Sequence, residues 1–153
     1  EGQYRLLCDA DLSVPIEQVE RVLPPLGPNA DIVFGSRETP TASRIGEPLR
    51  RHFMGRAFNW LVALLAVPGL ADTQCGFKCF RAEAAQDLFA RLTLDGFAFD
   101  VELFHLARKG GLSYSEVGVD WYYRSQSKVR PFQDALAMTF DLLKVRWRHR
   151  DSH

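Results

Sequence analysis

The segment "YRLLCDADLSVPIEQVERVLPPLGPNADIVFGS" (Tyr4–Ser36) contains the pattern that decides the fold. Its two ends, "YRLLCDA" and "DIVFGS", are short apolar runs bounded by charged or small residues, which is typical of buried strands. Between them, "PIEQVERVLPPL" places apolar residues at helical spacing behind Pro15, a residue suited to the first turn of a helix. Strand, helix and strand within this length form a βαβ unit, so we expect an α/β fold in which the two strands pair in parallel.

The rest of the chain continues to alternate between helical and strand patterns. The spacing predicts helices over 48–67, 82–92, 99–109 and 131–150, and strands over 73–80 and 114–124. Gly76 interrupts the first of these strands, and Gly110 and Gly111 end the third helix. The polar segment Arg37–Glu47, broken by Pro and Gly, predicts a mobile loop at the carboxyl edge of the sheet, where open α/β folds bind ligands.

Length and composition indicate one domain with a real core. The chain has 153 residues, 46% of them apolar, and its 19 basic and 19 acidic residues balance, so net charge gives no argument for a nucleic-acid partner. Three cysteines favour buried thiols in a reducing compartment over a disulfide scaffold or a zinc site. The apolar run Phe58–Leu70 is too short to span a bilayer, and the start at Glu1 predicts that the chain is a piece of a longer protein.

Asp9 and Asp11 follow the first strand directly, one residue apart. Two carboxylates in a partly desolvated cleft repel one another, and both can turn toward one hard divalent cation with oxygen ligands. The alternative from the local sequence is that Asp11 caps the following helix while Asp9 forms a salt bridge. An EF-hand fits poorly because Val14 stands where glycine is required, whereas a haloacid-dehalogenase-type phosphatase with Asp9 as nucleophile stays open.

Six further motifs carry a resemblance to a known family. In chain order they are "DADLSVP", "DIVFGSR", "GRAFNWL", "DTQCGFKCF", "GFAFDVELF" and "RSQSKV". Together they resemble the later part of a GT-A type enzyme of glycosyltransferase family 2, in the branch that moves glucose from a nucleotide sugar to dolichyl or another polyprenyl phosphate. The resemblance implies a partial GT-A fold with a mainly parallel sheet whose N-terminal strands are missing. It assigns residues 1–147 to the C-terminal part of one domain and residues 148–153 to a basic tail.

The resemblance also implies roles for charged residues. Asp9 and Asp11 match the DxD motif, in which a Mg²⁺ or Mn²⁺ ion is held against the diphosphate of the donor, with Asp11 the more direct ligand. A lipid phosphate is already mostly ionised at neutral pH, so the reaction hardly requires a strong base. It does require cations, because the phosphate groups of donor and acceptor repel one another. The matching cations are Arg37, Arg44, Arg124 and Lys128, for each of which the alternative is a solvated surface charge.

Three polar residues in the remaining motifs are further site candidates. Asp100 matches an acid that faces the acceptor in related inverting transferases, although it could instead be the N-cap of its helix, with Glu102 facing the helix dipole. Asp72 and Gln74 are expected to line the acceptor or sugar pocket, with Gly76 permitting close backbone approach, while a turn-stabilising Asp72 stays open.

The resemblance implies inverting, metal-dependent transfer of a hexosyl group, with glucose favoured, from UDP-glucose or GDP-mannose to a polyprenyl phosphate. Basic residues mixed with Phe and Trp in "RRHFMGRAFNWL" and "KVRWRHR" favour the cytoplasmic face of a membrane, peripheral or anchored through parts outside this chain. We expect the fragment to be inactive alone and to self-associate through its incomplete sheet. A module that binds membrane or lipid phosphate without catalysis is the alternative.

Overall fold

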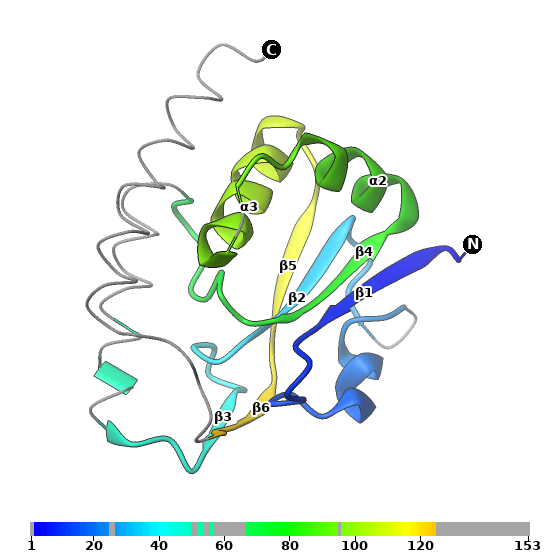
Figure 1. Cartoon of the computed structure of the whole chain (residues 1–153). Helices are drawn as coiled ribbons and strands as arrows, with labels where there is room; N and C mark the ends of the chain where they lie inside the picture. The colour runs from blue at the N-terminus through cyan, green and yellow to red at the C-terminus, as the bar shows by residue number, and fades with distance from the viewer. Residues whose placement is uncertain are drawn as a thin grey trace.

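Four strands form the central sheet, in the order β1 (Tyr4–Cys8), β4 (Phe77–Arg81), β2 (Ile32–Ser36) and β5 (Tyr114–Gly118) (Figure 1). The computed structural model describes residues 2–24, 27–49, 52–53, 56, 67–94 and 96–124. The expected helix over 131–150, most of that over 48–67, Lys128 and the basic tail lie outside these residues.

The strand pairing corrects the expected topology. β1 and β2 each pair antiparallel with β4, in registers that include Leu7↔Lys78 and Phe34↔Lys78, and only β2 and β5 pair in parallel. The direct parallel pairing of the first two strands is therefore wrong, as is the mainly parallel sheet. The α/β class is confirmed, and the two strands still run in the same direction because each opposes β4. An apolar pattern indicates that a strand is buried but does not predict which other strand pairs with it.

Two helices cover one face of this sheet, α2 (Ala82–Arg91) and α3 (Phe99–Lys109) (Figure 1). Ile32, Phe34 and Phe80 point toward these helices and pack with buried residues of α3. Residues Val33, Phe77 and Cys79, which alternate with them along the strands, belong to a second cluster on the other face, together with Val22 and Trp121. Both helices agree with the sequence pattern, and Gly110 follows α3 as expected.

The segment between β1 and β2 is a 3₁₀ helix, η1 (Ile16–Arg21), where an α-helix was expected. Pro15 lies at its N-cap position. Pro24 disfavours a helical backbone at Leu23, so only a short piece remains between the two prolines, and 3₁₀ geometry is common in such pieces. A second 3₁₀ turn, η2 (Gly96–Ala98), precedes α3.

The expected strand over 114–124 is divided between two sheets. It breaks at Val119, after which β6 (Asp120–Tyr122) pairs in parallel with β3 (Ser43–Ile45). β3 lies within the segment expected to be a mobile loop, so strand pairing and the bond from Ser43 N to Val119 O (3.1 Å) hold that segment in place. Among the described residues, no helix has the length and apolar character needed to cross a lipid bilayer.

Candidate active site

One edge of the sheet gathers most of the predicted site residues. β1 and β2 end at this edge and the antiparallel β4 begins there, so Asp9, Arg37 and the turn 72–76 come together. The backbone N–H of Asp9 donates to the carbonyl of Gly76 at 2.8 Å and ties the end of β1 to that turn. The predicted location at a carboxyl edge of strands is therefore confirmed.

Gly76 allows the Asp9 carboxylate to lie directly against the backbone of the turn. A Cβ atom at position 76 would lie 2.1 Å from the carboxylate carbon and from both oxygens of Asp9. Any side chain there would collide with the carboxylate. The group that lies close to Gly76 in the structure is the Asp9 carboxylate.

Asp9 and Asp11 differ in their hydrogen bonding. Both Asp11 oxygens accept bonds from Ser13, from its N–H at 2.9 Å and from its hydroxyl at 2.8 Å. The proposed capping role of Asp11 is thus wrong, because η1 begins after Pro15 without a side-chain cap. Within the described ranges the Asp9 carboxylate receives no hydrogen bond. Burial and then the charge of Asp11 raise the pKa of Asp9, while Lys78 and Arg37 lower it.

Arg37, the first residue after β2, is clamped by Asp72. Its Nε and one terminal nitrogen, Nη2, donate to the two Asp72 oxygens at 2.7 and 2.8 Å, and its backbone N–H adds a third bond at 3.0 Å. The guanidinium also lies over Trp121, 5.5 Å from the ring centroid. Asp72 is fully buried, and although burial raises its pKa, Arg37 outweighs this and holds the pKa at about 2. The arginine side chain is therefore fixed in direction.

The turn that carries Asp72 is itself anchored. The Glu116 carboxylate accepts the N–H groups of Ala71 (3.0 Å) and Asp72 (2.9 Å). Asp72 Oδ1 also accepts the N–H of Gln74 at 3.2 Å, so the turn-stabilising interpretation of Asp72 is confirmed alongside the arginine pair. The side-chain nitrogen Nε2 of Gln74 is buried and has no partner within the part of the chain that the structure describes.

Sequence reasoning missed Lys78, a fully buried lysine on β4. Its Nζ lies 2.7 Å from Asp100 Oδ1 and donates to the carbonyl of Cys75 at 2.7 Å. The available signal was a lysine between Phe77 and Cys79 in an apolar strand. Asp100 is not an N-cap, since Ala98 holds that position; burial raises its pKa, although Lys78 lowers it.

Glu102 also has a different role from the expected contact with the helix dipole. Its buried carboxylate accepts the N–H groups of Thr93 (2.9 Å) and Leu94 (2.8 Å) and the Thr93 hydroxyl (2.7 Å). These bonds hold the loop between α2 and α3.

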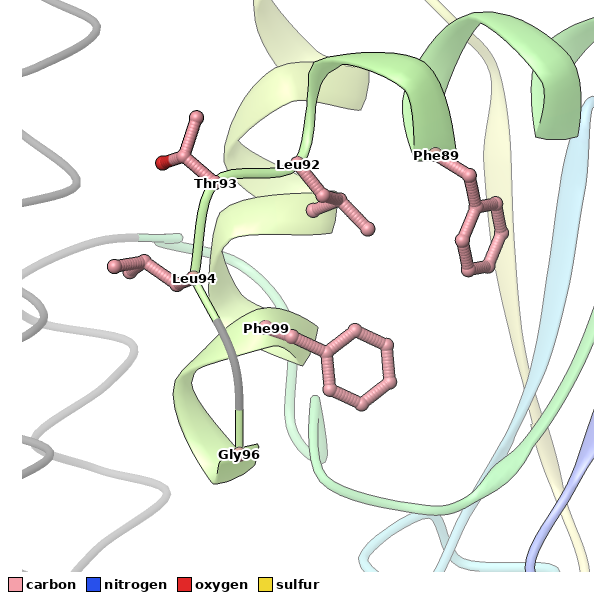
Figure 2. Close-up of a pocket in the computed structure, with 6 residues that line it drawn as sticks. All are labelled: Phe89, Leu92, Thr93, Leu94, Gly96 and Phe99. Carbon is pink, nitrogen blue, oxygen red and sulfur yellow. The ribbon is translucent and has the colours of Figure 1, made fainter.

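The loop borders an open pocket of about 430 Å³ that none of the predicted site residues lines, and Figure 2 shows the lining residues: Phe89, Leu92, Thr93, Leu94, Gly96 and Phe99.

The other predicted cations lie in different surroundings. Arg44 on β3 forms ion pairs with Glu38 and with Glu47 (2.6 Å), and its Nε donates to the carbonyl of Arg37 at 3.1 Å. Its charge is therefore already balanced by two carboxylates. Arg124 is exposed, two residues beyond β6. Among the described residues, no group of three or more His, Cys, Asp or Glu side chains gathers to hold a metal ion.

Comparison with known proteins decides the resemblance. The chain is 36% identical to the dolichyl-phosphate beta-glucosyltransferases of Mus musculus and Homo sapiens, and 34% identical to that of Dictyostelium discoideum, with 97% of the chain covered in each case. The chain is similar to dolichyl-phosphate beta-glucosyltransferases. It spans about half the length of these curated relatives, 47 to 48%. A scan against models of protein families finds none that matches. The predicted resemblance is confirmed.

Proposed function

We propose that this chain is part of an enzyme that transfers a glucosyl group, with inversion, from a nucleotide diphosphate sugar to dolichyl or another polyprenyl phosphate. The observation that carries the proposal is the sheet edge where Asp11, the clamped Arg37 and the Asp9 carboxylate, which accepts no hydrogen bond from the described residues, come together. The similarity over 97% of the chain to dolichyl-phosphate beta-glucosyltransferases supports the same reaction.

Asp9 and Asp11 are the residues that would hold Mg²⁺ or Mn²⁺. Their all-oxygen donor set suits a hard cation, and Asp9 has a raised pKa and no hydrogen-bond donor within the described structure, as expected for a carboxylate whose partner is a cation. The ion, when bound, neutralises charge that develops on the leaving diphosphate. Ser13 and Gly76 aim the two carboxylates.

Among the described residues, Arg37 is the best-placed cation for a phosphate group. Asp72 occupies Nε and Nη2, while the third nitrogen, Nη1, has no acceptor among the residues described, and the side chain is 18% exposed. Nη1 can donate to phosphate or sugar oxygens, and so can Nε2 of Gln74, for which the described residues provide no acceptor. Because a phosphate monoester is mostly ionised at neutral pH, positioning matters more than a strong base.

Arg124 and Lys128 remain predicted phosphate contacts. Arg44 could contact a phosphate only after its ion pairs with Glu38 and Glu47 are broken.

The sheet supports a partial GT-A fold to which further strands add. β1 is at one end of the strand order, and its Leu6 side chain is 37% exposed. An edge strand of this kind readily pairs with another strand. We assign residues 1–147 to the C-terminal part of the catalytic domain and expect the isolated chain to self-associate through β1. A monodisperse monomer in light scattering at high concentration would contradict the self-association.

A lipid acceptor places the reaction at a membrane surface, for which we propose the cytoplasmic face. Leu49 and Phe53 lie four residues apart and are 76% and 67% exposed, with the exposed cation Arg56 nearby in sequence. Apolar and basic side chains together favour an anionic lipid surface. Leu49→Glu should reduce sedimentation of the protein with anionic vesicles, and unchanged sedimentation would contradict this contact.

The test is radiolabel transfer by the longer protein that carries this chain. UDP-glucose and GDP-mannose are compared as donors to a polyprenyl phosphate, with and without EDTA, in the unsubstituted protein and in Asp11→Asn. The surface variant Asp87→Asn on α2 is the matched control. Transfer that survives both EDTA and Asp11→Asn refutes the metal mechanism. Hydrolysis of a phosphomonoester that depends on Asp9 favours a phosphatase, and lipid-phosphate binding without transfer favours the non-catalytic module.

A further inference from the structure

Lys78 is a charged residue that the proposed reaction does not explain. It lies in the middle of the four-stranded sheet, on β4, and its side chain has no exposed area. Transfer of an ammonium group from water into such a place is costly unless it is paired and hydrogen-bonded. A neutral apolar residue would fill the same place without that cost, so we expect the ammonium group to have a specific role in its contacts.

The contacts of Lys78 join two separate parts of the structure. On one side are Asp100, whose Oδ1 lies 2.7 Å from Nζ, and the Phe104 ring, whose centroid lies at 5.9 Å. These two residues are one turn apart on α3. On the other side Nζ donates to the Cys75 carbonyl at 2.7 Å, inside the turn 72–76. The ammonium thus ties this turn to the first half of α3.

That turn positions both charged groups of the sheet edge. Its Asp72 holds Arg37 by three hydrogen bonds. Its Gly76 accepts the backbone N–H of Asp9 and forms the surface against which the Asp9 carboxylate lies. A change in the shape of the turn would therefore move Asp9 and Arg37 relative to one another, and a displacement of about 1 Å is enough to lower a rate strongly.

We propose that Lys78 is a positioning residue of the candidate site, which fixes the turn 72–76 through the Cys75 carbonyl, and that Asp100 is its buried counter-ion and does not touch the substrate. This gives Asp100 a different part from the acceptor-facing one expected from the motif. The consequence for transfer rests on the proposed function, whereas the effect on the turn does not.

Three sets of variants separate these roles. Lys78→Met alone leaves Asp100 buried and unpaired, so it is expected to fold poorly. Lys78→Met combined with Asp100→Leu removes both charges at similar volume and is expected to keep the fold, but it lacks the bond to the Cys75 carbonyl. Asp100→Asn removes the charge that balances Lys78, so it is expected to lower stability, but it leaves the bond from Lys78 to the Cys75 carbonyl in place.

Hydrogen exchange in the 153-residue chain tests the positioning directly. The reporting amides are those of Asp9, Arg37 and Gln74, each of which donates to an atom of the turn. In the Lys78→Met/Asp100→Leu variant we expect these amides to exchange at least about tenfold faster while the amides of β2 keep their rates. The control is Arg91→Met/Asp87→Leu, which removes an exposed ion pair on α2. Equal exchange in the double variant and the unsubstituted chain overturns the proposal.

Transfer kinetics in the longer protein test the role of Asp100. Asp100→Asn should keep kcat within about tenfold of the unsubstituted enzyme, and the Lys78→Met/Asp100→Leu variant should lose about 100-fold or more at an unchanged melting temperature. Loss of transfer in Asp100→Asn with normal exchange at the turn would make its carboxylate part of the chemistry and overturn the counter-ion role. If the unsubstituted enzyme transfers nothing, the proposed function fails, while the exchange experiment still decides the role of Lys78.

Discussion

Gly76→Ala should weaken metal binding with little effect on stability. The new Cβ would lie 2.1 Å from the Asp9 carboxylate, whereas ordinary contact between such atoms begins at about 3.5 Å, so the carboxylate has to retreat by roughly 1.4 Å. A metal site tolerates ligand displacements of about 0.2 Å. Asp9 is therefore lost as a ligand, and we expect the dissociation constant for Mn²⁺ to rise at least tenfold, or about 1.4 kcal/mol.

The loss of stability should stay below about 1 kcal/mol, because the Asp9 side chain is partly exposed and can rotate away. The assay is titration of the chain with Mn²⁺, in which electron paramagnetic resonance reports the free ion and thermal unfolding reports stability. Asp9→Asn should match Gly76→Ala in affinity. Gly110→Ala is the control, because position 110 has a φ of −74° and a Cβ there meets no atom closer than 3.4 Å.

Two results would refute this reasoning. Mn²⁺ affinity that is unchanged in Gly76→Ala but lost in Asp9→Asn would show that contact with the turn does not aim the carboxylate. Unchanged affinity in both variants would show that Asp9 does not bind the ion at all.

Three further predictions concern buried groups. Asp72→Asn should cost about 3 kcal/mol in urea unfolding because it leaves Arg37 without its partner, and a cost below 1 kcal/mol would contradict the clamp. Since the pKa of Asp72 is held at about 2, its contribution is present above about pH 4 and is lost as the pH falls toward 2, where the two proteins should converge in stability. Burial raises the pKa of Cys75 to about 12, so iodoacetamide at pH 8 should label this thiol only after unfolding; labelling of the native chain would contradict its burial. Glu102→Gln should cost about 1–3 kcal/mol and speed exchange of the Leu94 amide, and unchanged exchange would show that Glu102 does not hold the loop.

The sequence predicted β1, β2 and the two described helices well because apolar spacing reports burial directly, but the strand expected over 73–80 begins only at Phe77 and β3 was not expected. The pattern of "AEAAQDLFARL" and "FDVELFHLARK" predicted helices that the structure contains as α2 and α3. It did not predict that β4 would lie between β1 and β2, since pairing depends on contacts between residues far apart in the chain. For the same reason, the sequence pattern did not predict that residues 114–124 are divided between two sheets.

For the candidate site, sequence alone determined which residues carry charge at the strand ends: Asp9 and Asp11 follow β1, and Arg37 follows β2. Only the tertiary structure decided what each of them contacts. Asp72 and Lys78 are the clearest cases, because their partners Arg37 and Asp100 are distant in sequence and meet them only in the folded chain. A local motif specifies which chemical groups are present. Burial and contacts with residues distant in sequence set the orientation and the protonation state of each group, and both depend on the folded chain as a whole.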